Sequence, residues 1–391
     1  MTVTSPKGFR ASGIAAGLKA SGGADVAVVV NDGPDATVAG VFTANRVKAA
    51  PVLWSQQVLK GGVVRAVVLN SGGANACTGT QGFRDTHATA EHTAAALRSG
   101  SKKPLLIGAG DVAVCSTGLI GELLPMDKLL PGVTAAVKAL DTGGGGKAAE
   151  AIMTTDTVAK NVHVERDGWS VGGIAKGAGM LAPALATMLV VLTTDAVAGS
   201  EALDTALREA TRLTFDRIDA DGCMSTNDTV LLLASGASDV QPEQDELTAA
   251  VTEACHALAQ QLIADAEGAT KHIAIEVLGA ASEADAVEVG RTVAGNNLVK
   301  TAMFGNDPNW GRILAAVGTT KAAFAPDRVD VGVNGVWVCK GGAAAEDRSK
   351  VDLSGRDVTI QVHLHEGEMD ATIWTTDLSH AYVHENSAYS T

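Results

Sequence analysis

The sequence predicts a mixed α/β (α+β) fold, because two kinds of segment alternate along the chain. Short apolar, partly β-branched runs end in turns rich in Gly, Asn and Ser, which is the pattern of buried strands. Longer segments place apolar residues at helical spacing. Apolar residues make up 46% of the 391 residues and charged residues 19%, so the chain can bury a sizeable core.

The first third of the chain contains the first predicted strands and a helix. Asp25–Val30 and Thr37–Thr43 are expected strands, separated by a turn cluster of the kind that joins hairpin strands. Val63–Leu69 is a further apolar strand, and Leu105–Ala109 is expected to add another. Thr86–Arg98 is Ala-rich with charges on one side, which predicts a surface helix.

Two loops of small residues follow predicted strands. Asn70–Gly79 lies between a strand and a helix, an arrangement that points backbone N–H groups at a ligand, but a plain tight turn is equally consistent. In Cys115–Gly121, Thr117 and Gly118 can supply a hydroxyl and an N–H, the parts of an oxyanion hole, although such a pair is also ordinary in a turn. The four-glycine run Gly143–Gly146 is expected to be a flexible loop.

A loop and a strand at the centre of the chain contain a candidate nucleophile. A Gly-containing loop from Lys176 leads to Met188–Leu192, a run that predicts a strand buried on both faces. Thr187 stands at the junction, directly after Ala186, where an N-terminal nucleophile would be placed. If Thr187 attacks the Ala186 carbonyl and the chain is cut, the freed α-amine, with an ordinary pKa of about 7.7–8, is a base beside Oγ1. The alternative is that Thr187 only begins a core strand.

The second half continues the alternation of helices and strands. Leu203–Phe215 and Asp245–Glu267 are expected helices, and Glu267 would lie in a last turn, where a carboxylate opposes the helix dipole. This position hints at function, with a solvated surface glutamate as the alternative. The polar tail Tyr382–Thr391 is of a kind that is normally frayed. Further strands are expected at Val230–Ala234, Ile273–Val277, Asp330–Val338, Val358–Leu364 and Ala371–Thr376.

Composition excludes several classes of function. A net charge of −14 and an aromatic content of 3% argue against a nucleic-acid binder and against a protein that binds anionic membranes. The five cysteines are scattered without C-x-x-C spacing, so neither a disulfide framework nor a zinc site is expected. No window approaches the ~20 apolar residues that a membrane helix needs. We therefore expect a soluble, cytoplasmic protein without a metal site.

Six motifs together resemble the ornithine acetyltransferase family of arginine biosynthesis, the bifunctional glutamate N-acetyltransferase/ornithine acetyltransferases. The similarity covers essentially the whole length. Its most specific blocks are KGAGMLAPALAT, Lys176–Thr187, and FGNDPNWGR, Phe304–Arg312. The sequence departs from the usual pattern at Gly73, where the family commonly has Asn. The other motifs are Val41–Arg46, Asn70–Gly79, Ser116–Gly118 and Met153–Thr157.

The resemblance implies a fold and a processing event. The family fold is a layered sandwich of helices and sheets, similar to that of the N-terminal nucleophile hydrolases. The precursor cuts itself between Ala186 and Thr187, which gives an α chain of residues 1–186 and a β chain of residues 187–391. Both chains build one catalytic unit, and the processed chains pair into α2β2 assemblies.

The resemblance also implies roles for individual residues. Thr187 becomes the catalytic nucleophile, and Thr117 and Gly118 match the oxyanion-hole pair. Within the MTTDT block Thr154 is the expected substrate contact, with Thr155 left open. The full set of substrate-binding residues implied is Thr154, Lys176, Thr187, Glu267, Asn386 and Thr391.

The reaction implied is a ping-pong transfer of the acetyl group from N2-acetyl-L-ornithine to L-glutamate through an acetyl-Thr187 ester. Lys176 is a partner for the α-carboxylate of either substrate, and Glu267 for the δ-ammonium of ornithine. No cofactor and no metal are needed, and direct acetylation of glutamate from acetyl-CoA is left open. Two alternatives remain: a related N-terminal-threonine amidohydrolase or aminopeptidase, and a non-enzymatic amino-acid-binding protein that is never cleaved.

Overall fold

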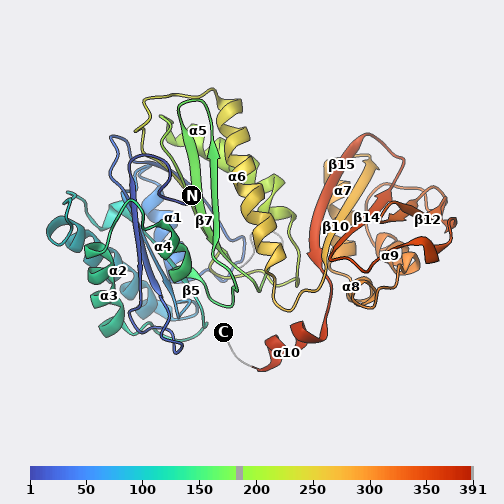
Figure 1. Cartoon of the computed structure of the whole chain (residues 1–391), viewed down its shortest axis with the longest axis horizontal. Helices are drawn as coiled ribbons and strands as arrows, with labels where there is room; N and C mark the ends of the chain where they lie inside the picture. Colours follow the sequence, from blue (N-terminus) through green and yellow to red (C-terminus); the bar gives the residue numbers. More distant parts are fainter. Residues whose placement is uncertain (182–187, 389–391) are drawn as a thin grey trace.

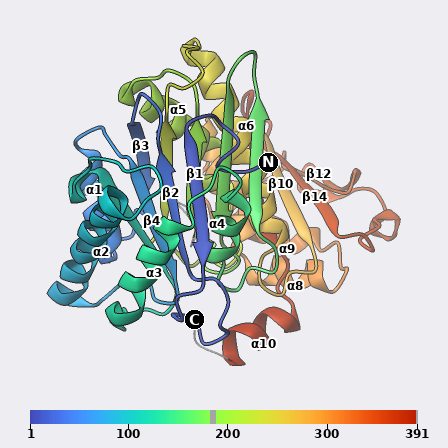
Figure 2. The same cartoon turned by 60° about the vertical axis from the view of Figure 1, so that its left-hand side comes forward.

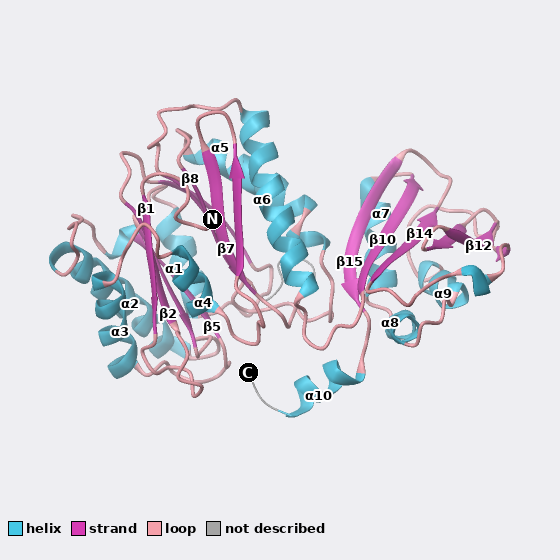
Figure 3. Ribbon diagram, viewed as in Figure 1, coloured by secondary structure: helices cyan, strands magenta, loops and turns pink. Residues whose placement is uncertain are grey.

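The computed structural model describes residues 1–181 and 188–388, and within these the chain forms a larger unit followed by a smaller one (Figure 1). The larger unit holds two stacked sheets, and the smaller unit holds a third sheet with helices on one side (Figures 1 and 3). After the last strand, the C-terminal helix α10 (His380–Ala388) runs back toward the larger unit. This return brings α10 to the site described below.

The first sheet of the larger unit has the strand order β1-β2-β4-β5. β1, β2 and β4 are antiparallel neighbours, whereas β4 and β5 run parallel. Every residue of β2, β4 and β5 is buried, because both faces of the sheet are covered. The strands are β1 (Phe9–Ile14), β2 (Val26–Asn31), β4 (Ala66–Ser71) and β5 (Val112–Thr117).

The second sheet has the order β3-β9-β8-β7-β6 and joins segments from both halves of the sequence. β8 lies at its centre, paired antiparallel to β7 and parallel to β9, and every residue of β8 is buried. This confirms the expected central strand after residue 187. The strands are β3 (Thr37–Phe42), β6 (Lys160–Glu165), β7 (Ser170–Lys176), β8 (Leu189–Thr194) and β9 (Thr229–Ala234).

Helices complete a four-layer sandwich of helices, sheet, sheet and helices (Figures 1 and 2). α2 and α3 pack on the outer face of the first sheet, and α5 and α6 cover the outer face of the second. Between the sheets lies a shared apolar core that α4 helps to fill. The layered helix–sheet sandwich expected from the sequence is thus confirmed. These helices are α1 (Ala50–Leu59), α2 (Gly79–Ser99), α3 (Met126–Lys138), α4 (Gly145–Ile152), α5 (Ser200–Leu213) and α6 (Gln244–Ala264).

The smaller unit has its own sheet and its own core. Its strand order is β13-β12-β11-β14-β10-β15, and its apolar face packs against α7 and α9. The strands are β10 (His272–Ala280), β11 (Asp330–Val333), β12 (Val336–Lys340), β13 (Ala343–Ala344), β14 (Asp357–His363) and β15 (Met369–Thr376). The helices are α7 (Glu283–Ala294), α8 (Asn297–Phe304) and α9 (Trp310–Val317), and short 3₁₀ turns occur at Ala109–Asp111, Phe215–Arg217 and Arg348–Lys350.

Three strand predictions are wrong in detail. β2 and β3 do not form a hairpin, since the Asn31–Asp35 turn carries the chain from the first sheet to the second. Turn residues encode a reversal of the chain but not the partner of the strand that follows. Leu105–Ala109 is not a strand. Asp330–Val338 is a hairpin rather than one strand, because Asn334 and Gly335 adopt φ of 45° and 81°, as a tight hairpin turn requires.

The glycine run at 143–146 is not a flexible loop. It leads into α4, and Gly144 and Gly145 are buried against the first strand and the N-terminal segment. A Cβ on Gly144 would lie 1.8 Å from the Ala11 carbonyl oxygen, so only glycine allows this approach. Here the absence of side chains serves close packing of backbone on backbone rather than mobility.

Candidate functional site

Of the residues that the resemblance singled out, the six that lie in the described ranges line one cavity. Each lies at or just beyond the end of an element, so the sandwich brings together segments that are far apart in sequence. Thr117 ends β5, Lys176 ends β7, and Asn386 lies on α10. The lining consists of Thr117, Gly118, Ile120, Thr154, Thr155, Lys176, Gly179, Met180, Glu267 and Asn386.

Lys176 places a buried amine inside this cavity. The residue is 2% exposed, and its Nζ donates to the Thr117 Oγ1 over 3.3 Å. Burial lowers the pKa of Lys176, while the nearby carboxylates of Asp156, Asp228 and Glu267 favour its charged form. An amine in such surroundings is suited to receive an anionic ligand group, because pairing with it offsets the loss of hydration.

The backbone at Gly118 is shaped for close approach. Gly118 has φ of +127°, and a Cβ there would lie 2.7 Å from the Gly73 nitrogen, so the position requires glycine. The carbonyl of Thr117 accepts from the N–H groups of Gly72 and Gly73 over 2.9 and 3.1 Å. The two loops of small residues noted in the sequence therefore brace one another, and this fixes the Thr117–Gly118 peptide at the edge of the cavity.

Glu267 does not lie in a helix turn, as the sequence analysis predicted, because α6 ends at Ala264. It lies in the turn beyond, where its N–H donates to the Ala178 carbonyl over 2.9 Å. Its carboxylate packs against the backbone of Gly179, where a Cβ would lie 2.6 Å from Oε2. The lack of a side chain at Gly179 thus leaves room for this carboxylate beside the loop.

The described part of the C-terminal tail is held in place by this turn. Asn386 Nδ2 donates to Glu267 Oε2 over 3.0 Å, and the Ser379 hydroxyl donates to the Gly268 carbonyl over 2.5 Å. A frayed tail, expected from polarity alone, is therefore wrong for α10. The contact of Asn386 with Glu267 agrees with the grouping of these two residues that the resemblance implied.

A buried ionic network supports the floor of the site, and the sequence analysis missed it. Lys160 is fully buried, and its Nζ donates to Asp156 Oδ1 and Asp265 Oδ2, both over 2.6 Å. Asp156 also accepts from the Thr154 N–H over 3.0 Å and from the Gly177 N–H over 2.7 Å. The signal available in the sequence was the acidic residue within the MTTDT block, followed by a lysine four positions later.

The charge state of Asp156 follows from these neighbours. Burial alone would raise the pKa of its carboxyl group, but the charges of Lys176 and Lys160 and the Gly177 N–H lower it to about 2. Asp156 is thus a stable carboxylate between two buried lysines. Thr154 and Thr155 both line the cavity, and Asp156 fixes the backbone of the first.

Three predicted residues fall outside the described ranges: Ala186, Thr187 and Thr391. The described chain resumes at Met188, which is buried next to the start of β8. Its N–H donates to Asp228 Oδ1 over 3.1 Å, and its carbonyl accepts from the Thr229 N–H over 3.2 Å.

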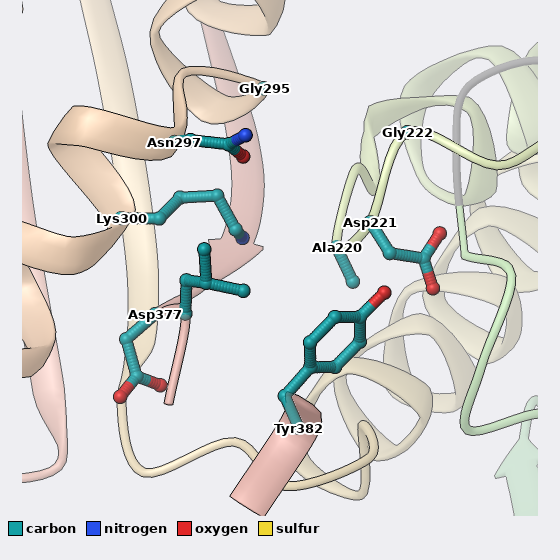
Figure 4. A pocket seen from close by; sticks show the side chains of 9 residues that line it. Ala220, Asp221, Gly222, Gly295, Asn297, Lys300, Asp377 and Tyr382 are labelled. Atoms are coloured by element: carbon teal, nitrogen blue, oxygen red, sulfur yellow. The ribbon is translucent and has the colours of Figure 1, made fainter. Parts of the chain in front are cut away.

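A second pocket lies where the two units meet (Figure 4), and none of the predicted site residues lines it. Asp221 and Tyr382 face one another across it, and burial together with the charge of Asp221 raises the pKa of Tyr382 to about 12. On the side of the smaller unit, Lys300 Nζ donates to Thr375 Oγ1 over 3.0 Å. Burial lowers the pKa of Lys300 to about 8, against the charges of Asp219, Asp221 and Asp377, which favour its charged form.

Residues 1–181 and 188–388 include no group of three or more His, Cys, Asp or Glu side chains arranged to hold a metal ion. None of their helices is long and apolar enough to cross a membrane.

Comparisons with known proteins agree with the motifs. The sequence profile described as the ArgJ family matches residues 10–391. The arginine biosynthesis bifunctional proteins ArgJ of Streptomyces avermitilis and Streptomyces coelicolor are each 66% identical over 390 residues, which covers 100% of both chains compared. A crystal structure titled as ornithine acetyltransferase complexed with ornithine, from Mycobacterium tuberculosis, is 61% identical; it covers 48% of this chain and 96% of that chain, with a TM-score of 0.46.

Proposed function

The chain belongs to the ArgJ family, and from this premise we propose that it transfers the acetyl group of N2-acetyl-L-ornithine to L-glutamate in arginine biosynthesis. The observation that carries the proposal is the convergence of Thr117, Gly118, Lys176, Glu267 and Asn386 on one cavity. These residues supply hydrogen-bond donors for an oxyanion, an amine that can pair with a carboxylate, and a carboxylate that can pair with an ammonium group. An N-acetylated diamino acid requires all three.

In this proposal Thr187 is the nucleophile, and it becomes the N-terminus of a β chain when the precursor is cut after Ala186. β7 ends before the cut and β8 begins after it, yet the two strands are antiparallel neighbours over six residue pairs. The α chain, 1–186, and the β chain, 187–391, would therefore stay joined by this ladder and by the shared core between the sheets. That supports one catalytic unit built from both chains, and we extend the proposal to α2β2 pairing in the cytoplasm.

The proposed reaction has two halves. Thr187 Oγ1 attacks the amide carbonyl of N-acetylornithine, and the α-amine of the same residue takes the hydroxyl proton and then passes it to the leaving ornithine amine. Thr117 and Gly118 stabilise the oxyanion, and one such donor is worth about 2.7–4 kcal/mol. Glutamate then attacks the acetyl ester and leaves as N-acetylglutamate.

Substrate binding follows the charges of the cavity. Lys176 is buried, and its ammonium form, which the nearby carboxylates favour, suits the α-carboxylate that both amino acids share. Glu267 suits the δ-ammonium of ornithine, with Asn386 orienting its carboxylate through the 3.0 Å hydrogen bond. Thr154 and Thr391 complete the proposed contacts. Acetyl-CoA as an additional donor would use the same acetyl-Thr187 ester.

The first test is a denaturing gel of the purified protein with N-terminal sequencing of each band. Cleavage after Ala186 predicts pieces of 186 and 391 − 186 = 205 residues, the second beginning Thr-Met-Leu-Val-Val. Thr187→Ala should remain one chain without transferase activity, whereas Thr248→Ala, at a half-buried position of α6 that does not line the cavity, should be cut normally. A pure, folded wild-type protein that stays uncut would instead favour the amino-acid-binding alternative.

The second test separates transfer from hydrolysis. A ping-pong transferase exchanges labelled ornithine into N-acetylornithine without glutamate, because the acetyl-enzyme forms reversibly. Glutamate should then capture the acetyl group faster than water does. Release of acetate at the same rate with and without glutamate would favour the amidohydrolase alternative.

A further inference from the structure

The two amino acids of the proposed reaction carry opposite charges at the ends of their side chains. Ornithine ends in an ammonium group, which suits Glu267, whereas glutamate ends in a second carboxylate, which the charge of Glu267 repels. Lys176 can pair with the α-carboxylate that both amino acids share. The γ-carboxylate of glutamate therefore needs a further cation near the cavity.

The loop between β1 and β2, residues 15–25, lies at the edge of the first sheet that holds the proposed oxyanion pair. β1 ends at Ile14, which pairs with Val26 at the start of β2. Val26 pairs in turn with Asn70 of β4, and Asn70 pairs with Ser116 of β5. The loop therefore leaves the sheet at the same end as the turn that follows β5.

Packing and hydrogen bonds fix this loop against the site. Leu18 lies on the backbone of Gly72, where a Cβ would be 2.8 Å from the Leu18 Cβ. Gly72 donates its N–H to the Thr117 carbonyl over 2.9 Å. The buried carboxylate of Asp25 accepts from the N–H groups of Leu18 and Lys19 over 2.6 and 3.1 Å. Lys19 is thus held one residue away from a direct contact with the backbone that braces Thr117.

The side chain of Lys19 is half-buried and forms no ion pair within the described part of the chain. Its Nζ donates to the Ala24 carbonyl over 2.7 Å. Burial lowers the pKa of Lys19, whereas the charges of Asp25 and Asp156 favour its ammonium form and the charge of Lys176 opposes it. The amine therefore lies within electrostatic reach of the site, and an incoming carboxylate would offset its loss of hydration.

We propose that Lys19 determines specificity for the acceptor, because its ammonium group pairs with the γ-carboxylate of glutamate while Lys176 holds the α-carboxylate. This role deepens the proposed function and rests on it. N-acetylornithine has no second carboxylate, so the first half of the reaction does not need Lys19. In the second half, the ion pair offsets the repulsion from Glu267 and orients the amine of glutamate toward the acetyl group.

The test is Lys19→Met in the full chain, with each half of the reaction measured separately. KM for glutamate should rise at least 10-fold, because the variant keeps most of the side-chain volume but loses the charge. KM for N-acetylornithine and the rate of ornithine exchange without glutamate should stay within 3-fold of wild type. Lys19→Arg restores a cation that can pair with a carboxylate, so it should lower KM for glutamate again.

A change of acceptor isolates the effect of charge. Glutamine has the shape of glutamate but a neutral amide in place of the γ-carboxylate, so it cannot form the ion pair. The wild type should use glutamate with a kcat/KM at least 10-fold above that for glutamine, and Lys19→Met should lower this ratio at least 5-fold. A merely structural loss would affect both acceptors alike and leave the ratio unchanged.

Lys128 supplies the matched control, because it holds the same loop from α3. It is exposed, and its Nζ donates to the Gly17 carbonyl over 3.1 Å. Lys128→Met removes a lysine and its hydrogen bond to this loop but leaves Lys19 in place. Both KM values and the ratio of the two acceptors should therefore stay within 2-fold of wild type.

The outcomes separate the role of Lys19 from the proposed function. An unchanged acceptor ratio in a folded Lys19→Met protein would overturn this role, while exchange and transfer by the wild type would still support the transferase. An equal rise in both KM values, or the same effect from Lys128→Met, would also overturn it, since the loop would then act only by its shape. If Lys19→Met does not fold, Lys19→Gln keeps a donor for the Ala24 carbonyl and must show the same loss of ratio. A wild type without ornithine exchange would instead remove the proposed function itself.

Discussion

Replacing Lys160 with methionine tests the buried network beneath the site most directly. Lys160 is fully buried and donates to Asp156 and Asp265 over 2.6 Å each. Lys160→Met keeps most of the volume of the side chain but removes the cation that Asp156 and Asp265 share. Breaking a buried ion pair by removing one partner costs about 3–5 kcal/mol, a large share of the ~5–15 kcal/mol by which most domains are stable.

The loss should depend on pH in a defined direction. The pKa of Asp156 is lowered to about 2 in the folded wild type, so its stabilisation is fully present above about pH 4 and disappears as the pH falls toward 2. Without Lys160 the pKa of this carboxyl rises, and protonation relieves the unpaired charge. The destabilisation by Lys160→Met should therefore be largest near pH 7 and shrink toward pH 4.

The assay is urea unfolding at pH 7 and at pH 4.5, with Arg208→Met as the control. Arg208 pairs with Asp204 over 2.7 Å, but both side chains are largely exposed, so that variant should lose only about 0.2–1 kcal/mol. A loss below about 1 kcal/mol for Lys160→Met at pH 7 would refute the reasoning. So would a loss that grows as the pH falls.

Three further predictions follow from single residues. Glu267→Gln should raise KM for N-acetylornithine at least 10-fold and leave KM for glutamate within 3-fold, as steady-state kinetics with each substrate varied would show; equal changes would remove the δ-ammonium role. Gly144→Ala should destabilise the protein or prevent folding, because its Cβ would lie 1.8 Å from the Ala11 carbonyl oxygen, and a thermal melt checks this. Burial raises the pKa of Asp219 to about 6 against the opposing charge of Lys300, so its cost to stability grows between pH 4 and 6. Asp219→Asn should therefore stabilise the protein more at pH 7 than at pH 4 in urea titrations, and an equal effect at both would contradict this.

The sequence by itself determined the class of fold and the identity of most of the described site. Periodicity located the central strand β8 and the helices α5 and α6, because a buried strand and an amphipathic helix leave strong local patterns. The motifs singled out Thr117, Lys176 and Glu267, and family membership is confirmed. Local patterns in the sequence report burial and turn chemistry. They therefore predict correctly those segments in which a single pattern, such as the apolar run of β8, prevails.

Only the tertiary structure decided which segments meet. The turn at residues 31–35 gave no sign that β2 and β3 belong to different sheets, because strand partners lie far apart in sequence. The glycine run before α4 has the composition of a linker but serves close backbone packing. The pairing of Lys160 with Asp265, 105 positions away, is likewise a consequence of burial in three dimensions. Long-range contacts set the charge states and the geometry of this site, and no local pattern encodes them.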